Sequence, residues 1–221
     1  MKSRIAEIHR RLLDKFGHHR KQTDEDPTGA LVLGILSANT NDINRDRAYA
    51  QLVAHYDNEK TRWSDVAAEK TEKLAAIIRP AGMSMIRAER IKDALEKLRR
   101  DFGDYIAQPL LEMEPQKAFD KLVQLNGIGG KTAAVFLVFH SEQDVPFFPV
   151  DTHIDRVSKR LGLFPKKYGH AKIQEGFTDN ISPEKVLDFH VNIILLGRNI
   201  CTARKAMCDD CPLNDICPKK I

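Results

Sequence analysis

Apolar side chains recur at helical spacing along almost all of this 221-residue chain, and this periodicity constrains its fold more than any other feature. The pattern is clear over residues 5–16, 74–78, 91–102 and 119–123. Prolines suited to a first helical turn predict helix starts at Pro27, Pro115 and Pro183. Glycines that follow apolar stretches predict helix ends at Gly82, Gly103, Gly127 and Gly197. The chain is therefore expected to be all-α.

One stretch departs from the helical pattern, "DVPFFPVDT" at residues 144–152. Its two prolines are incompatible with a central strand, so we expect a stiff extended connector and a domain boundary near residues 141–150. Upstream, "TGALVLGILSA" at residues 28–38 is apolar on nearly every side. Such a helix is surrounded by others, so it is expected at the centre of a bundle.

Composition and charge indicate a globular protein with one good core or two small ones, since 42% of the residues are apolar. The N-terminus "MKSRIAEIHRR" lacks the apolar segment of a signal peptide, and no apolar run is long enough to span a bilayer. We therefore expect a cytoplasmic protein with no membrane partner. A net charge of +4 is weak evidence for nucleic acid. Residues 87–100 hold six Lys or Arg against three Asp or Glu, which suits either a phosphate contact or a solvated helix face.

The stretch "LNGIGGKTA" at residues 125–133 resembles a phosphate-binding P-loop at first sight. A P-loop requires glycine five residues before Gly130, where this chain has Leu125, and a preceding strand, where this chain predicts a helix. The expected structure is a tight turn between two helices through Gly127, Gly129 and Gly130. Unpaired N–H groups at the second helix start, including that of Thr132, would bind one DNA phosphate without reading sequence. The alternative is an ordinary glycine turn between packed helices.

Lys131 is predicted in the first turn of that second helix, where the helix dipole and the backbone N–H groups disfavour an ammonium ion. A neutral lysine amine can attack C1′ of a deoxyribose and form a Schiff base. A solvated surface lysine is the alternative.

Asp151 in "PVDTHIDRV" is a natural N-cap for a helix with an apolar stripe. Helix capping alone would explain it. As a catalytic group, a carboxylate held beside the hairpin could stabilise positive charge on the sugar as a glycosidic bond breaks, or assist a deprotonation. His153, two residues on, is a candidate for contact with the DNA base.

All four cysteines lie in the last 21 residues, as Cys201, Cys208, Cys211 and Cys217 in the pattern C-x6-C-x2-C-x5-C. This clustering favours a local metal site over a disulfide framework. The spacing alone leaves zinc and an iron-sulfur cluster equally open. Arg204 and Lys205, between the first two cysteines, would suit a further phosphate contact.

Taken in order, "LNGIGGKTA", "VDTHIDRV" and the cysteine pattern resemble the endonuclease III family of DNA glycosylases, from about Pro27 to Cys217. "HVNIILLGRNIC" is similar to the helix before that family's cluster loop. The resemblance implies a six-helix barrel domain, residues 28–142, with the helix-hairpin-helix at about 115–140. Residues 1–27 and 143–221 would form the iron-sulfur cluster domain, with the cluster loop at 201–217 and a DNA cleft between the domains.

The resemblance also implies roles for individual residues. Lys131 would be the Schiff-base nucleophile, Asp151 the catalytic carboxylate, and the four cysteines the ligands of a 4Fe-4S cluster. Asn39 stands where the family often has a Gln that fills the gap left by a flipped base. Met83 stands at the position of a hydrophobic wedge, although core packing would explain a methionine equally well.

We interpret the chain as a bifunctional DNA glycosylase and AP lyase of base excision repair, cytoplasmic and associated with the nucleoid. Its expected partner is double-stranded DNA carrying a damaged base, an oxidised pyrimidine, or an abasic site, and a monomer without a nucleotide cofactor is expected. One alternative is a monofunctional mismatch-specific glycosylase that removes adenine, thymine or uracil; such relatives typically lack the lysine. The other is a non-catalytic helix-hairpin-helix DNA-binding protein with a structural zinc.

Overall fold

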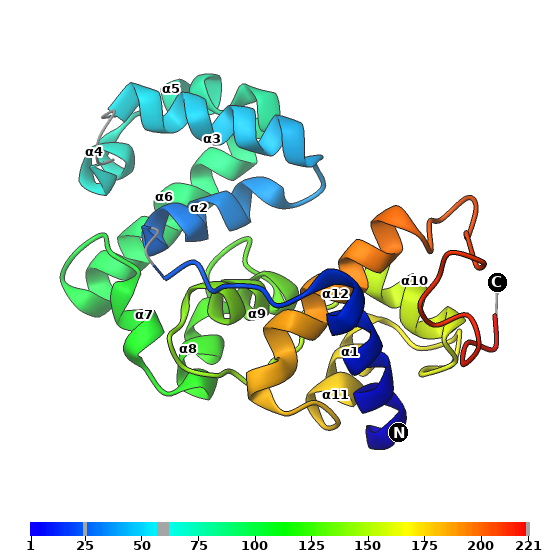
Figure 1. Ribbon diagram of the computed structural model, residues 1–221. Helices are drawn as coiled ribbons and strands as arrows, with labels where there is room; N and C mark the ends of the chain where they lie inside the picture. The colour runs from blue at the N-terminus through cyan, green and yellow to red at the C-terminus, as the bar shows by residue number, and fades with distance from the viewer. Residues whose placement is uncertain (24–25, 57–61, 220–221) are drawn as a thin grey trace. The chain divides into compact units, whose positions relative to one another are not determined.

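The computed structural model describes residues 1–23, 26–56 and 62–219, and it confirms that the chain is all-α (Figure 1). The described residues form twelve α-helices and two 3-10 helices and no β-strand. The helices are α1 Lys2–Phe16, α2 Pro27–Ser37, α3 Asp42–Tyr56, α4 Trp63–Ala68, α5 Thr71–Ile77, η1 Arg79–Ala81, α6 Ser84–Phe102, α7 Gln108–Glu112, α8 Pro115–Leu122, α9 Gly130–His140, α10 Thr152–Arg160, α11 His170–Thr178, η2 Pro183–Lys185 and α12 Val186–Asn199. None of these described helices is long and apolar enough to cross a membrane.

The chain divides into two compact units. Gln22–His140 form one unit, which contains α2 to α9 and which we call the hairpin unit. Met1–Lys21 and Ser141–Ile221 form the other, which contains α1 and α10 to α12 and which we call the cysteine unit. The cysteine unit thus combines the two ends of the chain.

Helix α2 is the central helix of the hairpin unit, as its all-round apolar sequence predicts. It packs against α3, α6 and α9, and Leu31 and Ile35 are no more than 1% exposed. Asp26 caps its start, because the Oδ1 atom accepts a hydrogen bond from the Thr28 N–H at 2.9 Å. The same carboxylate accepts a bond from Trp63 Nε1 at 2.7 Å, which ties the start of α2 to α4.

The core of the cysteine unit forms around α12, which packs against α1 and α10. An aromatic cluster fills it, with the Phe148 ring centroid 4.4 Å from that of Phe177 and 5.9 Å from that of Phe189. Phe148 belongs to the connector predicted from its prolines, and residues 142–151 form neither helix nor strand. The prediction that this segment is not a strand is confirmed, and burial of Phe148 and Val150 anchors it.

Three predicted helix boundaries are wrong. Gly197 lies inside α12 and does not end it; an added Cβ there would lie 3.1 Å from the Cβ of His153, so the close approach of α10 favours glycine. Gly127 lies in a turn beyond the end of α8 at Leu122. Pro183 opens η2, and α12 begins only at Val186.

Candidate functional site

The glycine-rich turn joins α8 to α9, as predicted for a helix-hairpin-helix. The turn is closed by Leu125 N–H to Leu122 O and Ile128 N–H to Leu125 O, both 3.0 Å, and the apolar side chains of Leu125 and Ile128 are buried. Helix α9 begins at Gly130, so the N–H groups of its first turn have no carbonyl partner within the helix. An anion placed there would meet both these donors and the positive end of the helix dipole.

Side chains of helix α6 contact this turn. Gly127 has a φ of +91°, which favours glycine, and a Cβ at that position would lie 2.6 Å from Arg90 Cδ. The Arg90 side chain therefore packs directly on the turn backbone. Asn126 donates from Nδ2 to Asp93 Oδ2 at 3.3 Å, which adds a second link to α6.

Lys131 and Thr132 occupy the first turn of α9, but they face different surroundings. Lys131 is exposed, which leaves its amine accessible to a ligand. Thr132 is half-buried, and its Cγ2 would lie 2.9 Å from a Cβ added to Gly34 on α2. The threonine methyl group thus packs on α2, and only its backbone N–H remains a candidate for the phosphate contact. Gly129 has nothing within 4 Å of an added Cβ, so the surface beside it is open.

Asp151 belongs to the cysteine unit and caps α10, as one of its two predicted roles requires. Its Oδ1 accepts a hydrogen bond from the Ile154 N–H at 2.8 Å, and the residue is half-buried. The cap uses one carboxylate oxygen. His153 packs beside Gly197 of α12, and its Nδ1 lies 3.1 Å from Arg156 Nη2 on α10 itself. The structure therefore gives His153 a packing contact in the cysteine unit.

Asn39 and Met83 follow α2 and precede α6, respectively, in the hairpin unit. Both are exposed and both have positive φ angles, 55° and 47°, which are uncommon for residues other than glycine. Met83 is 53% exposed, so the alternative that it packs in the core is wrong. Two further apolar side chains nearby in the sequence, Met85 and Ile86, are each 43% exposed. This part of the hairpin unit therefore exposes three apolar side chains on its surface.

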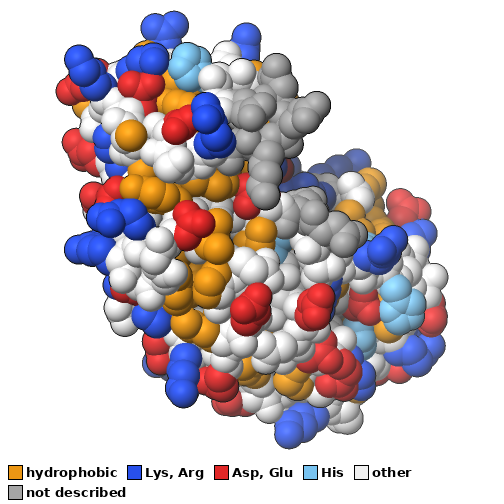
Figure 2. Space-filling view, turned by 90° about the vertical axis from the view of Figure 1, so that its left-hand side faces the viewer, with side chains coloured by type: hydrophobic (Ala, Val, Ile, Leu, Met, Phe, Trp, Pro, Cys, Tyr) orange, Lys and Arg blue, Asp and Glu red, His pale blue; other side chains and the backbone are white. Residues whose placement is uncertain are grey.

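The basic stretch 87–100 lies on α6 and is mostly a solvated face. Arg99 and Lys97 form ion pairs with Glu96 and Asp101 at 2.9 and 3.2 Å. Figure 2 likewise shows basic and acidic side chains interspersed on the face drawn. Arg87 is the exception, because it is only 2% exposed. Its burial was missed from the sequence, since a buried arginine and a surface arginine have the same local pattern.

The four cysteines are half-buried free thiols that line one cavity. Apolar side chains from α10 and α12, Val157 and Leu196, complete its wall. Burial raises the pKa of the Cys211 thiol, and the other three thiols add to the effect. The donor set therefore fits a four-thiolate centre. Within the described ranges, however, no three Cys, His, Asp or Glu side chains converge closely enough to hold a metal ion.

Residues 201–217, which we call the cysteine loop, are anchored to α10 at the beginning of the loop. Arg160 Nη1 donates to Thr202 O at 2.7 Å and lies 3.4 Å from Cys201 Sγ. The next residues form a small loop, closed by the bridge between Cys201 and Ala206 and by the bond from Thr202 Oγ1 to Lys205 O at 2.6 Å. Arg204 and Lys205 are exposed on this loop. Their side chains are therefore free to meet a phosphate.

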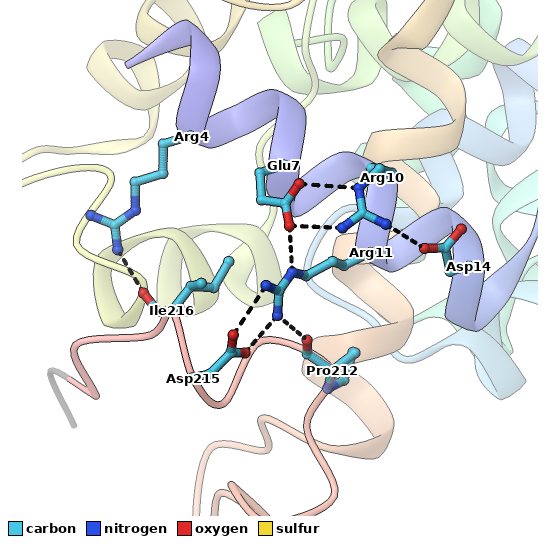
Figure 3. A network of polar contacts seen from close by, with 8 residues as sticks. All are labelled: Arg4, Glu7, Arg10, Arg11, Asp14, Pro212, Asp215 and Ile216. Atoms are coloured by element: carbon cyan, nitrogen blue, oxygen red, sulfur yellow. Dashed lines mark hydrogen bonds and ion pairs between the residues drawn. The ribbon is translucent and has the colours of Figure 1, made fainter.

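Helix α1 anchors the other end of the cysteine loop (Figure 3). Arg11 reaches both Asp215 oxygens, at 2.5 and 3.0 Å, and the Pro212 carbonyl at 3.3 Å. Glu7 accepts from Arg11 Nε at 2.6 Å, and the hydrogen bonds from Arg10 and Arg11 lower the pKa of Glu7 to about 2. These contacts join residues about two hundred positions apart, and no local sequence signal predicts them.

Comparison with known proteins gives one family match and several relatives. Residues 32–183 match the family model described as "HhH-GPD superfamily base excision DNA repair protein". Endonuclease III of Rickettsia prowazekii is 35% identical over 188 residues, which cover 85% of this chain and 81% of that protein. Two solved structures each share 26% identity and a TM-score of 0.80, and cover 99% of this chain and 96% of theirs. One is a non-covalent endonuclease III–DNA complex and the other a trapped endonuclease III–DNA covalent intermediate.

Proposed function

This chain belongs to the HhH-GPD superfamily, within its endonuclease III family, and is a base excision repair DNA glycosylase; we propose that it is also an AP lyase. Its partner is DNA. In this proposal it removes oxidised pyrimidines from duplex DNA and then cleaves the strand by β-elimination. The observation that carries the proposal is an exposed lysine, Lys131, in the first turn of α9, directly after the glycine turn.

The position of Lys131 suits a nucleophile. The free N–H groups beside it would hold a phosphate of the strand, so the sugar of the same nucleotide or its neighbour would lie within reach of the amine. The lone pair of the amine forms a bond to C1′ while the bond from C1′ to the base breaks. The electron pair of the broken bond leaves with the base, which takes up a proton, and the lysine nitrogen loses one. The bond between C1′ and the ring oxygen then breaks as that oxygen takes up a proton, and the lysine nitrogen and C1′ form an iminium ion. Loss of a proton from C2′ then expels the 3′ phosphate and cleaves the strand.

Asp151 would assist this step. One of its oxygens is held by the cap of α10, which fixes the orientation of the carboxylate. The remaining oxygen would stabilise positive charge on the sugar as the glycosidic bond breaks, or accept a proton from the lysine or a water. The carboxylate would thus combine capping with catalysis.

Other groups would bind the DNA without entering the chemistry. Gly127, Gly129 and Gly130 would leave the turn backbone open to a phosphate, and Arg204 and Lys205 would supply a further phosphate contact. Asn39 and Met83 would fill the gap that the extruded nucleotide leaves. These contacts are independent of base identity, so substrate choice would depend on the pocket that receives the flipped base.

The four cysteines would hold a 4Fe-4S cluster, which we propose is structural. When bound, such a cluster would hold four thiolates together and order the loop between Cys201 and Cys217. The anchors of that loop on α10 and α1 would then present Arg204 and Lys205 to DNA.

Borohydride trapping tests the lyase proposal. Wild-type protein incubated with abasic or thymine-glycol duplex and borohydride should form a covalent complex, and Lys131→Gln should abolish it while retaining DNA binding. Lys117→Gln is the matched control, because Lys117 is an exposed lysine on α8 of the same hairpin. Absence of any trapped complex with wild type would refute the lyase assignment.

A panel of lesion duplexes tests the substrate. Oligonucleotides with thymine glycol, dihydrouracil, uracil, or T·G and A·G mismatches should give fastest base release for the oxidised pyrimidines. Release confined to mismatches, without trapping, would instead identify a monofunctional mismatch glycosylase. A colourless, zinc-containing protein that releases no base would identify a non-catalytic DNA-binding protein.

A further inference from the structure

Arg87 is a buried cation held by backbone carbonyls. It is the fourth residue of α6, only 2% exposed, and among the largest fully buried side chains in the described chain. No carboxylate in the described ranges forms an ion pair with it. Burial lowers the pKa of its guanidinium, and the charge of Arg90 adds to that effect. A buried cation of this kind needs compensating contacts to be tolerated.

Backbone carbonyls supply those contacts, and they come from the end of α2 with the loop after it and from the loop before α6. Nη1 donates to Ile35 O at 2.7 Å and to Leu36 O at 2.9 Å, and Nη2 donates to Ala38 O. These acceptors lie at the end of α2, where carbonyls lack helical donors and the dipole is negative. Nε donates to Gly82 O at 2.7 Å, in the loop before α6. One side chain therefore cross-links both loops.

The cross-linked peptides are the ones that precede Asn39 and Met83. Hydrogen bonding to the Ala38 carbonyl fixes the peptide plane that leads into Asn39, and bonding to the Gly82 carbonyl does the same for Met83. Both following residues adopt positive φ angles, 55° and 47°. Uncommon backbone conformations of this kind persist where surrounding contacts hold them. Arg87 supplies such a contact to both loops.

We propose that Arg87 is a positioning residue that holds Asn39 and Met83 at a fixed separation, so that both enter the DNA base stack together. This inference rests on the proposed function, in which those two side chains fill the gap of the flipped nucleotide. Because the two loops would already be ordered before DNA binds, extrusion of a base would not carry the entropic cost of ordering them. Lysine could not replace the arginine, because one ammonium cannot span carbonyls of both loops in the same planar arrangement.

A double-mutant cycle on base extrusion tests this. The probe is a duplex that carries 2-aminopurine beside a tetrahydrofuran abasic analogue, which forms no Schiff base, so the readout is independent of Lys131 chemistry. Arg87→Met should lower the affinity measured from the fluorescence change by about tenfold to a hundredfold. This is the scale expected when a positioned group is misplaced by about 1 Å. In the Asn39→Ala/Met83→Ala background, the same substitution should have little further effect.

Controls separate positioning from a structural role. Arg99→Met removes an exposed arginine of α6 and should leave extrusion unchanged. Circular dichroism should show native helicity for each variant, and Arg87→Lys enters the same cycle if Arg87→Met does not fold. An equal loss in both backgrounds, or wild-type extrusion by the Arg87 variants, would overturn the proposal. Failure of the lyase proposal would appear separately, as absence of borohydride trapping.

Discussion

Gly127→Ala should destabilise the hairpin unit more than the same change at Gly103. Both glycines have positive φ angles, +91° and +82°, and an alanine in that region costs about 1–2 kcal/mol. Nothing lies within 4 Å of a Cβ at Gly103, whereas a Cβ at Gly127 would lie 2.6 Å from Arg90 Cδ. Moving the Arg90 side chain out of its rotamer adds about 0.5–1.5 kcal/mol. The two substitutions therefore differ by the cost of that one contact.

Thermal unfolding monitored by tryptophan fluorescence measures this difference. The single tryptophan, Trp63, is 6% exposed within the hairpin unit, so its emission reports the unfolding of that unit. At about 2–4 °C per kcal/mol for a chain of this size, Gly103→Ala should lower the melting temperature by about 2–8 °C. Gly127→Ala should lower it by about 1–6 °C more. Adding Arg90→Ala to Gly127→Ala should recover only that extra part.

DNA binding provides the second readout. Gly127→Ala should weaken binding to damaged and undamaged duplex by a similar factor, because a turn that contacts phosphate carries no sequence information. Gly103→Ala, at the end of α6, should not change binding. Equal melting temperatures for the two alanine variants would refute the role of the Arg90 contact, and unchanged DNA affinity of Gly127→Ala would refute the role of the turn.

Three further predictions concern the cysteine unit. Asp151→Asn keeps an N-cap residue, so it should abolish base release with little loss of stability. Asp151→Ala should abolish base release and also lower the free energy of unfolding by about 1 kcal/mol. Equal stability of the two variants in urea unfolding would contradict the capping role. The pKa of Glu7 is lowered to about 2, so the contribution of its carboxylate to stability is complete above about pH 4.5 and is lost as the pH falls toward 2. The difference in unfolding free energy between wild type and Glu7→Gln should therefore shrink over that range. A difference that stays constant with pH would exclude the ion pairs of Glu7 as its source. Arg11→Met frees the loop between Cys211 and Cys217 and should lower the iron content and the absorbance near ~400 nm, whereas Arg10→Met, which has no loop contact in the described residues, should not.

Local patterns were sufficient to predict the all-α class and the hairpin. A helix over residues 27–37 follows from its N-cap, its proline and its continuous apolar run, and α9 begins at Gly130, directly before Lys131 as expected. These features depend on residues three or four positions apart, so the sequence around them is enough. The expected roles of Lys131, Asp151 and the cysteines in catalysis and cluster binding stay predictions for the experiments above.

Contacts between distant segments could not be predicted in the same way. Gly197 was expected to end a helix, yet it serves the close packing of α12 on α10. Arg11 meets Asp215 across 204 positions, and Arg87 meets the end of α2 across about fifty. Whether a charged side chain is solvated or buried depends on which carbonyls and carboxylates the fold brings to it, and that is absent from any local window. The sequence alone thus determined which segments are helical and which residues could do chemistry, whereas the tertiary structure decided which side chains hold the loops that present them.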